Sequence, residues 1–459
     1  MKVLRPLLVL GLTLPVVACG PSNPTADSGP QNDAGPAGDD AGRTDAAMRP
    51  DAGPTNDSFE GARAVTTDGT AVTDAIEAPN DVDYWRFEGT AGDWIAINTT
   101  ANPDDDPEMV DTVITLFDST RTQIAENDDG LPRASTDSEI VIRLPSTGTY
   151  YIEVQEFSTW MPADPPAPEG RGSFTYELAV GTLTNTGAVN IDQEPGDDAA
   201  TARALTFGGT SGGLAFAMGS FNDATDVDVY SFSVATMQQI LSIDIMPAGA
   251  DGYGSTRAAG RIWVTDMAGT EILARVEPRG MLQNDLSPTL VPGDYLLWVD
   301  AGGGTAGTND HYVLKALLGT ENPLENETVA NSNDMTATAT ALTMEDDGMG
   351  TSRGFIIATL GAGDVDVFSF AVPAGRHINA YCGSQSVGSG VRGLQGVLLD
   401  SSSASVGMGT ETATDGVAIT DITPAAAGTY YLRLTPGTHD PEVTSSFVRC
   451  GVALTTPAP

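Results

Sequence analysis

The sequence predicts an all-β protein in which three tandem jelly-roll-like β-sandwich domains follow a disordered tether. Two strand motifs each occur three times in the same order, and no stretch of the 459 residues keeps a sustained helical period. Short strands separated by frequent turn signals are typical of sandwiches of this type. We therefore expect one sandwich in each of three segments, at residues 56–182, 188–319 and 325–455.

The first motif is an Asp-x-Asp pair that leads into an aromatic strand. Its three copies are Asp81–Phe87, Asp226–Phe232 and Asp364–Phe370. Because side chains alternate between the two faces of a strand, the large aromatic residues are expected to face the core together with the second Asp of each pair. An unpaired buried charge is costly, so this carboxylate needs a partner. We expect that partner to be a loop N–H group, an arginine or a metal ion.

The second motif begins with Gly and continues as a half-buried strand. Gly provides the turn, and the alternation of residue types that follows indicates one buried face. Its copies are Gly148–Val154, Gly293–Val299 and Gly428–Leu434. A middle strand and a closing strand complete each unit, at Thr112–Asp118, Arg261–Asp266 and Gly396–Asp400, and at Phe174–Val180, His311–Leu317 and Ser446–Leu454.

The chain is strongly acidic, with 62 acidic and 21 basic residues and a formal net charge of -41. This charge argues against binding to nucleic acid or to an anionic membrane through a basic surface. It is compatible with binding of divalent cations, and also with a solvated acidic surface that only keeps the protein soluble.

Residues 1–18 have the features of a signal peptide: a basic start and an apolar stretch, Leu7 to Val17, that is too short to span a membrane. The sequence Val-Val-Ala-Cys-Gly around Cys19 resembles a bacterial lipobox. This resemblance implies cleavage before Cys19, acylation of its thiol and attachment to the outer membrane at the cell surface. The alternative is an ordinary secretory signal with a chance cysteine.

Residues 19–55 are rich in Pro, Gly, Asp, Ala, Ser and Asn and offer almost no apolar side chain to bury. We expect this segment to be a disordered, extended tether that holds the domains away from the membrane. Its composition resembles that of tethers in myxobacterial surface lipoproteins.

The order of the motifs resembles the bacterial pre-peptidase C-terminal domain. The marks are the Asp-x-Asp-aromatic-x-Phe strand, a middle strand that ends in Asp, the loop Glu126–Gly130 and the Gly-Thr-Tyr-Tyr strand. Segment 56–182 matches best, whereas the middle loops of the other two segments differ. The resemblance implies non-catalytic β-sandwiches, which in this family are often joined to secreted proteases. Some members bind calcium, and some bind collagen or other polymers.

The same resemblance implies calcium ligands near the start of each domain, from an acidic segment and from the Asp-x-Asp pair. The matching positions are Asn56, Asp57, Asp81 and Asp83; Glu194, Asp197, Asp226 and Asp228; and Asn333, Asp334, Asp364 and Asp366. Clusters of carboxylate and amide oxygens suit a hard cation such as calcium. The alternative is that these residues cap turns by accepting bonds from loop N–H groups.

Catalytic motifs are weak in this chain, and we expect no enzyme activity. None of the three histidines forms a His-Glu-x-x-His zinc motif. Two Gly-x-Ser-x-Gly strings, centred on Ser211 and Ser352, precede predicted β-strands, whereas a nucleophile elbow requires a helix after the serine.

Cys382 lies on an early strand of the third segment and Cys450 on its last strand. Export implies an oxidising compartment, so we predict a disulfide between them. The alternative is a pair of free, buried thiols.

Three large side chains are expected outside the cores. Leu296 and Trp298 face away from the second core, and Trp160 lies in a Pro-rich loop. We expect them to pack against a neighbouring domain, with a ligand-binding surface as the alternative.

Together these features predict a lipid-anchored surface protein whose domains bind an extracellular protein or polysaccharide, with calcium as a stabilising ion. The alternatives are a structural spacer without a ligand and an accessory module for a separately encoded secreted protease. The identity of the ligand and the oligomeric state do not follow from the sequence.

Overall fold

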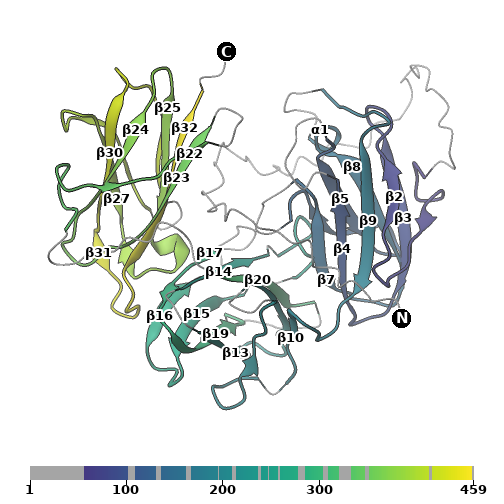
Figure 1. Ribbon diagram of the computed structural model, residues 1–459. Helices are drawn as coiled ribbons and strands as arrows, with labels where there is room; N and C mark the ends of the chain where they lie inside the picture. Colours follow the sequence, from purple (N-terminus) through teal and green to yellow (C-terminus); the bar gives the residue numbers. More distant parts are fainter. Residues whose placement is uncertain are drawn as a thin grey trace, which may run out of the picture.

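The computed structural model describes residues 56–456 except for residues 102–108, 131–135, 162–166, 195, 209–212, 236–238, 247, 257–258, 278–284, 303–308, 320–331, 347–350 and 413–415. These residues form three β-sandwiches in chain order, which we name domains 1, 2 and 3 (Figure 1). The predicted all-β fold class is therefore confirmed. Residues 1–55, with the expected signal peptide, Cys19 and tether, lie outside the described residues.

Each domain consists of a front sheet, which contains the aromatic Asp-x-Asp strand, and a back sheet, which contains the closing strand. In the described residues, helical structure is limited to α1 (Phe157–Trp160) and the 3-10 turn η1 (Gln385–Val387). Neither of these, nor any other part of the described chain, forms a helix with the length and apolar character needed to cross a membrane.

Domain 1 shows how the sequence pattern forms the core. Along the aromatic strand, buried and more exposed residues alternate, so Trp85 and Phe87 are only 1% and 3% exposed, as predicted. The front sheet has the order β1-β3-β8-β5-β6 and the back sheet β2-β9-β4-β7. The strands are β1 (Arg63–Ala64), β2 (Val72–Ala75), β3 (Val82–Gly89), β4 (Trp94–Thr100), β5 (Thr112–Phe117), β6 (Gln123–Asn127), β7 (Glu139–Arg143), β8 (Gly148–Glu156) and β9 (Thr175–Thr182).

Domain 2 repeats this topology with an added strand at the edge of its back sheet. The front sheet has the order β11-β13-β19-β15-β16 and the back sheet β10-β12-β20-β14-β17, with β18 also paired to β14. The strands are β10 (Val189–Ile191), β11 (Arg203–Ala204), β12 (Gly213–Ser220), β13 (Val227–Val234), β14 (Gln239–Ile245), β15 (Arg261–Asp266), β16 (Ile272–Val276), β17 (Asp285–Leu286), β18 (Thr289–Leu290), β19 (Gly293–Asp300) and β20 (His311–Gly319).

Domain 3 follows the same plan, with the front order β21-β24-β30-β27-β28 and the back order β22-β23-β32-β25-β29. Cys382 and Cys450 are directly opposite each other on β25 and β32 and are joined by a disulfide. The strands are β21 (Thr340–Ala341), β22 (Glu345–Asp346), β23 (Ser352–Thr359), β24 (Asp366–Val372), β25 (His377–Gly383), β26 (Val391–Arg392), β27 (Gln395–Leu399), β28 (Ser405–Thr410), β29 (Val417–Ile422), β30 (Gly428–Thr435), β31 (Thr438–His439) and β32 (Phe447–Thr455).

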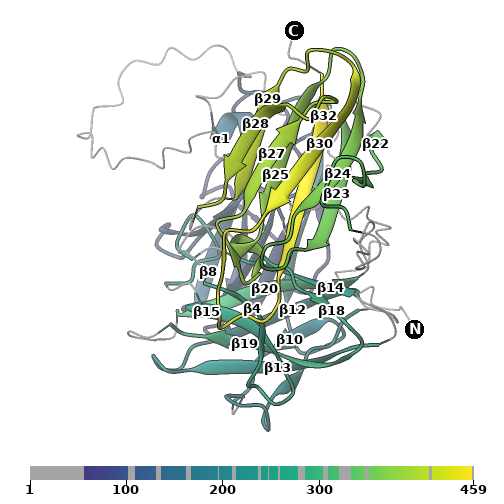
Figure 2. The same ribbon diagram turned by 90° about the vertical axis from the view of Figure 1, so that its left-hand side faces the viewer.

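Domain 2 lies beneath domains 1 and 3 and contacts both (Figure 1, Figure 2). Phe216 and Val313, on the back sheet of domain 2, belong to the same apolar cluster as the core of domain 1. Lys315 of β20 forms a 2.9 Å ion pair with Glu139 of β7 beside them. Burial of apolar surface thus continues from one sandwich into the next.

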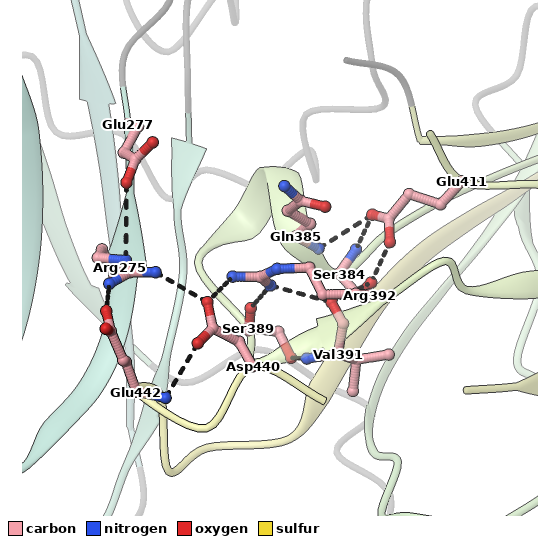
Figure 3. A network of polar contacts seen from close by, with 10 residues as sticks. All are labelled: Arg275, Glu277, Ser384, Gln385, Ser389, Val391, Arg392, Glu411, Asp440 and Glu442. Atoms are coloured by element: carbon pink, nitrogen blue, oxygen red, sulfur yellow. Dashed lines mark hydrogen bonds and ion pairs between the residues drawn. The ribbon is translucent and has the colours of Figure 1, made fainter. Parts of the chain in front are cut away.

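A polar network joins domain 2 to domain 3 (Figure 3). Asp440 accepts bonds of 2.8 Å from Arg275 of domain 2 and from Arg392 of its own domain. Arg275 also pairs with Glu442, and its backbone N–H bonds the Gly388 carbonyl at 3.1 Å. A carboxylate that accepts bonds from two arginines is held firmly, because charge-assisted hydrogen bonds are stronger than neutral ones.

Candidate metal site

The predicted acidic segments and Asp-x-Asp pairs lie side by side in all three domains. One backbone bond fixes this arrangement in each domain: Tyr84 N–H to Asn56 O at 2.7 Å, Val229 N–H to Gly196 O at 2.8 Å, and Val367 N–H to Asn333 O at 3.0 Å. A two-residue strand then pairs in parallel with the aromatic strand and holds the segment against it. The three sites therefore occupy equivalent places in the fold.

The first Asp of each pair caps the loop that precedes it. Asp81 accepts the Glu77 N–H at 2.7 Å, Asp226 accepts the Asn222 N–H at 2.5 Å, and Asp364 accepts the Gly361 N–H at 3.2 Å. In domains 1 and 3 the second carboxylate oxygen also accepts the N–H of the following residue. These three residues thus make turn-capping bonds, which is the role that we gave as the alternative to metal binding.

Domain 2 gathers five carboxylates at this place. Asp192 follows β10, and Glu194 and Asp197 precede β11, while Asp226 and Asp228 lie at the start of β13. Two overlapping groups have one oxygen of each residue within 4.8 Å of the others: Asp192, Glu194 and Asp228, and Glu194, Asp197 and Asp226. In the described part of the chain, no other acidic, histidine or cysteine side chains converge in this way.

Asp228 is the most deeply buried member of the domain 2 cluster. Its side chain is 0% exposed, and within the described residues neither carboxylate oxygen makes a well-formed hydrogen bond. Burial, followed by the negative charge of Asp192, raises the pKa of Asp228 to about 9, and the nearby Tyr312 hydroxyl offsets only part of this rise. At neutral pH this carboxyl group therefore holds a proton unless a cation replaces it.

The carboxylates around Asp228 are perturbed in the same direction. Burial is the largest cause of the raised pKa values of Asp192, Glu194 and Asp226, and repulsion from nearby carboxylates, including Asp197, adds to it. Arg203 acts in the opposite direction on Asp192, but its positive charge does not cancel the rise in the pKa of that carboxyl group. Converging oxygens of this kind are the donor set that a hard divalent cation prefers.

Domain 1 stabilises the equivalent carboxylate with its own side chains. The Tyr176 hydroxyl donates to Asp83 at 2.6 Å and accepts from the Trp85 indole at 3.0 Å. Arg63 pairs with Asp74 at 2.6 Å. Burial still raises the pKa of Asp83 to about 8, with smaller contributions from the charges of Asp74, Asp81 and Asp57, and the Tyr176 bond opposes that rise.

Domain 3 also buries the second Asp of its pair. Asp366 and Asn333 are 0% and 2% exposed, whereas Asp334 is exposed. The Asn333 amide donates to Thr340 at 3.3 Å, and Thr340 occupies the position of Arg63 in domain 1. The predicted residues are again neighbours, but they form no group of three converging carboxylates among the described residues.

Sequence reasoning missed two acidic residues of these sites. Asp192 lies two positions before Glu194, and the alternation of an extended segment could have suggested a shared side. Asp74 is on β2, opposite Tyr176 of β9. Its approach to the cluster depends on the pairing of distant strands, for which the sequence contains no local signal.

Ser352, Trp298 and Leu296 were also singled out in the sequence. Ser352 is the first residue of β23, so a strand and not a helix follows it, while Ser211 lies outside the described residues. Trp298 does not need a neighbouring domain, because it stacks on Trp263 of its own domain with 5.5 Å between ring centroids. Leu296 is fully buried.

Residues 81–156 match the family model described as the bacterial pre-peptidase C-terminal domain. This range begins at the first Asp-x-Asp pair and ends with β8, so the match covers most of the front sheet of domain 1. The family is consistent with a non-catalytic module. No curated protein matches the chain.

Solved structures with some similarity include the triple jelly roll of an archaeal virus turret, at 10% identity, a TM-score of 0.16 and 82% coverage of both chains. Tripeptidyl peptidase 2 matches at 8% identity and a TM-score of 0.19, covering 82% of this chain and 34% of that one. The BSP domain of a biofilm-associated protein matches at 13% identity and a TM-score of 0.13, covering 84% and 68%. Scores this low support no conclusion about function.

Proposed function

We propose that the chain is a non-catalytic surface lipoprotein whose three β-sandwich domains bind an extracellular polymer, with a calcium ion held by domain 2. In this proposal all three domains belong to the pre-peptidase C-terminal type, although the family match covers only part of domain 1. The observation that carries the calcium site is the fully buried Asp228, which lacks well-formed hydrogen bonds beside Asp192 and Glu194.

The donor set suits calcium better than a softer metal. It consists only of oxygen atoms, and the described neighbourhood contributes no cysteine or histidine. Asp192, Glu194 and Asp228 would hold the ion, and Asp197 and Asp226 would complete its surroundings. A bound divalent cation would let these carboxylates ionise together, because it supplies the positive charge that they lack. We expect a dissociation constant of about 10⁻⁴ to 10⁻³ M, as in other extracellular calcium modules.

Isothermal titration calorimetry with calcium tests this site directly. The wild-type chain should bind calcium with release of protons, because the carboxyl groups must ionise to become ligands. Asp228→Asn should abolish this heat. Asp83→Asn, the matched substitution in domain 1, should preserve it. A loss of binding only in Asp83→Asn would show that the calcium site is in domain 1.

Attachment of the chain to a membrane is a separate part of the proposal, based on the lipobox-like sequence around Cys19. Cys19→Ser should move the protein from the membrane fraction to the soluble fraction of the cell and prevent incorporation of labelled fatty acid. Recovery of the variant in the membrane fraction would contradict the anchor.

Polymer binding is proposed from the family match to domain 1. The two alternative functions are a spacer without a ligand and an accessory module for a separate secreted protease. Pull-down with collagen, peptidoglycan and polysaccharides separates a binding module from a spacer. Retention on none of these polymers would favour the spacer.

A further inference from the structure

The outward face of the front sheet of domain 1 carries a row of polar side chains across four strands. The pairing register places Tyr84 of β3 beside Glu153 of β8, Glu153 beside Thr115 of β5, and Thr115 beside Glu126 of β6. All four lie between inward-facing core residues of their strands, so they point away from the core. We refer to these residues as the polar row.

The polar row is linked by hydrogen bonds. The Tyr84 hydroxyl donates to Glu153, and the Thr115 hydroxyl donates to Glu126 at 3.0 Å. Gln155 also donates to Glu153 at 3.0 Å. Burial raises the pKa values of both glutamates, and their bonds to neighbouring groups offset part of each rise. The row thus presents two half-buried carboxyl groups at fixed positions.

Half-buried aromatic rings flank the polar row at both ends. Phe59 contacts Tyr84, Phe117 and Tyr151, with ring centroids 4.6 to 5.4 Å apart. At the other end, the indole of Trp160 is close enough to Glu126 to lower its pKa. None of these rings belongs to the apolar core of the domain. Partly exposed aromatic rings around hydrogen-bonding groups are typical of binding surfaces.

The equivalent rows of the other domains have different chemistry. In domain 2 the register gives Val229, Trp298, Trp263 and Arg275. The two Trp rings stack on each other, and Arg275 pairs with domain 3. In domain 3 the row is Val367, Arg433, Val397 and Met408. A shared fold therefore does not require the acidic and aromatic face of domain 1.

The polar row ends beside a hollow between domains 1 and 2. Ile124, two residues before Glu126 on the same face of β6, lines this hollow together with Arg143, Ala250 and Thr256. Its volume is about 570 Å³. The Glu126 N–H bonds the Gly252 carbonyl at 3.0 Å, which places the loop of domain 2 next to the row. An extended ligand on the row has space to continue into this hollow.

We propose that this face of domain 1 binds a neutral polysaccharide, a proposal that rests on the polymer-binding role proposed above. The aromatic rings offer apolar surfaces for the C–H faces of sugar rings, and the carboxyl groups accept bonds from sugar hydroxyls. The acidic row and the net charge of -41 disfavour an anionic polymer, although Arg86 lies beside Tyr151 on the same face. A neutral polysaccharide carries hydroxyl groups along its whole length, so it can bond to both carboxyl groups of the row.

Affinity electrophoresis of the purified full chain tests this proposal. Native gels would contain soluble β-glucan, xylan, mannan or dextran, with alginate as the anionic comparison and gelatin as the protein comparison. We expect at least one neutral polysaccharide to retard the chain. Tyr151→Ala and Trp160→Ala should each weaken binding roughly tenfold, and Glu153→Gln should weaken it several-fold.

Tyr431→Ala is the matched control, because Tyr431 occupies the position of Tyr151 in domain 3 and is also half-buried. It should leave retardation unchanged. Thermal unfolding of each variant shows whether it is folded, and Glu153→Gln keeps the shape of the side chain if the Trp160 variant does not fold.

Three results would overturn the proposal: retardation only by alginate, retardation only by gelatin, or equal retardation of the Tyr151→Ala and wild-type chains. Binding to gelatin alone would support the polymer-binding role but would show that the polymer is a protein. If no polymer in the panel retards the chain, the polymer-binding role fails together with this face.

Discussion

Domains 1 and 2 bury an aspartate at the same place, but they stabilise it in different ways. In domain 1, Tyr176 donates to Asp83, and Arg63 neutralises the neighbouring Asp74. In domain 2, the partner position of Asp74 is Gly219, and the carboxylates of Asp192 and Glu194 lie beside the buried Asp228 instead. In domain 1 a hydroxyl donor and a paired arginine compensate the carboxylates, whereas in domain 2 Tyr312 and Arg203 only partly offset the raised pKa values of Asp228 and Asp192.

Gly219 shows how small the local difference is. A Cβ atom at this position would lie 2.8 Å from one Asp228 carboxylate oxygen and 2.6 Å from the Tyr312 hydroxyl. Contacts this short would force one of those groups to move. The same strand position therefore supplies a carboxylate in domain 1, whereas in domain 2 Tyr312 and Asp228 occupy the place that a side chain would take. Repeated domains can thus keep one fold while their sites diverge.

The largest expected difference between the two sites is the direction in which a leucine substitution changes the free energy of unfolding, measured in EDTA. Asp83→Leu should lower the free energy of unfolding by about 1–3 kcal/mol, because the buried Tyr176 hydroxyl loses its acceptor. Asp228→Leu should raise it by about 1–3 kcal/mol, because an uncompensated buried carboxyl group is removed. Urea unfolding midpoints measure both changes, and shifts in the same direction would contradict the comparison.

The pH dependence of stability in EDTA sharpens the comparison further. The pKa of Asp228 is about 9 in the folded state and 3.8 for an ordinary aspartate, so the folded state retains a proton that the unfolded state has released. Its contribution to stability is therefore complete below about pH 4 and is lost as the pH rises toward 9, by at most about 1.4 kcal/mol per pH unit.

Melting temperatures between pH 5 and pH 9 test this dependence. Asp228→Asn should flatten the curve, and Asp83→Asn should flatten it only up to about pH 8, where the pKa of Asp83 lies. Saturating calcium should also flatten the wild-type curve, because the cation replaces the proton. Curves with equal slopes for wild type and Asp228→Asn in EDTA would show that Asp228 does not retain its proton.

The smallest expected effects concern the capping residues. Asp81→Ala should cost about 1 kcal/mol, since the Glu77 N–H loses its acceptor. Asp226→Ala should cost less in EDTA, because it also relieves repulsion from Asp197. Asp334→Ala, at an exposed position, is the control and should change stability by less than about 0.5 kcal/mol. If Asp226→Ala lowered the free energy of unfolding more than Asp81→Ala, Asp226 would be stabilised by its surroundings, which would contradict the repulsion from Asp197.

The repeats made much of the fold predictable. Alternation along Asp81–Phe87 places Trp85 and Phe87 in the core, and the three middle strands and three closing strands lie within a few residues of their expected ranges. Local alternation was sufficient because one face of each strand is buried. The proximity of Asp57, Asp81 and Asp83 also followed, since all three belong to segments next to one strand.

The differences between the sites could not be predicted in the same way. Which side chain lies opposite the tyrosine beside the second Asp depends on the register of β2 with β9 and of β12 with β20. That register is set by contacts distant in sequence. The contact of Arg275 with Asp440 likewise depends on how two whole domains pack. Local patterns carry no information about either.

We propose that domain 2 binds a calcium ion through Asp228 and its neighbours, and thermal unfolding tests this proposal most directly. The purified chain would be unfolded in EDTA, in 10 mM calcium and in 10 mM magnesium. At the expected affinity, calcium should stabilise the folded state by about 1–3 kcal/mol, which appears as a rise of several degrees in the melting temperature. Magnesium should have little effect, and Asp228→Asn should lose the response while Asp83→Asn retains it. An equal response in wild type and Asp228→Asn, or no response to calcium in either, would contradict the claim.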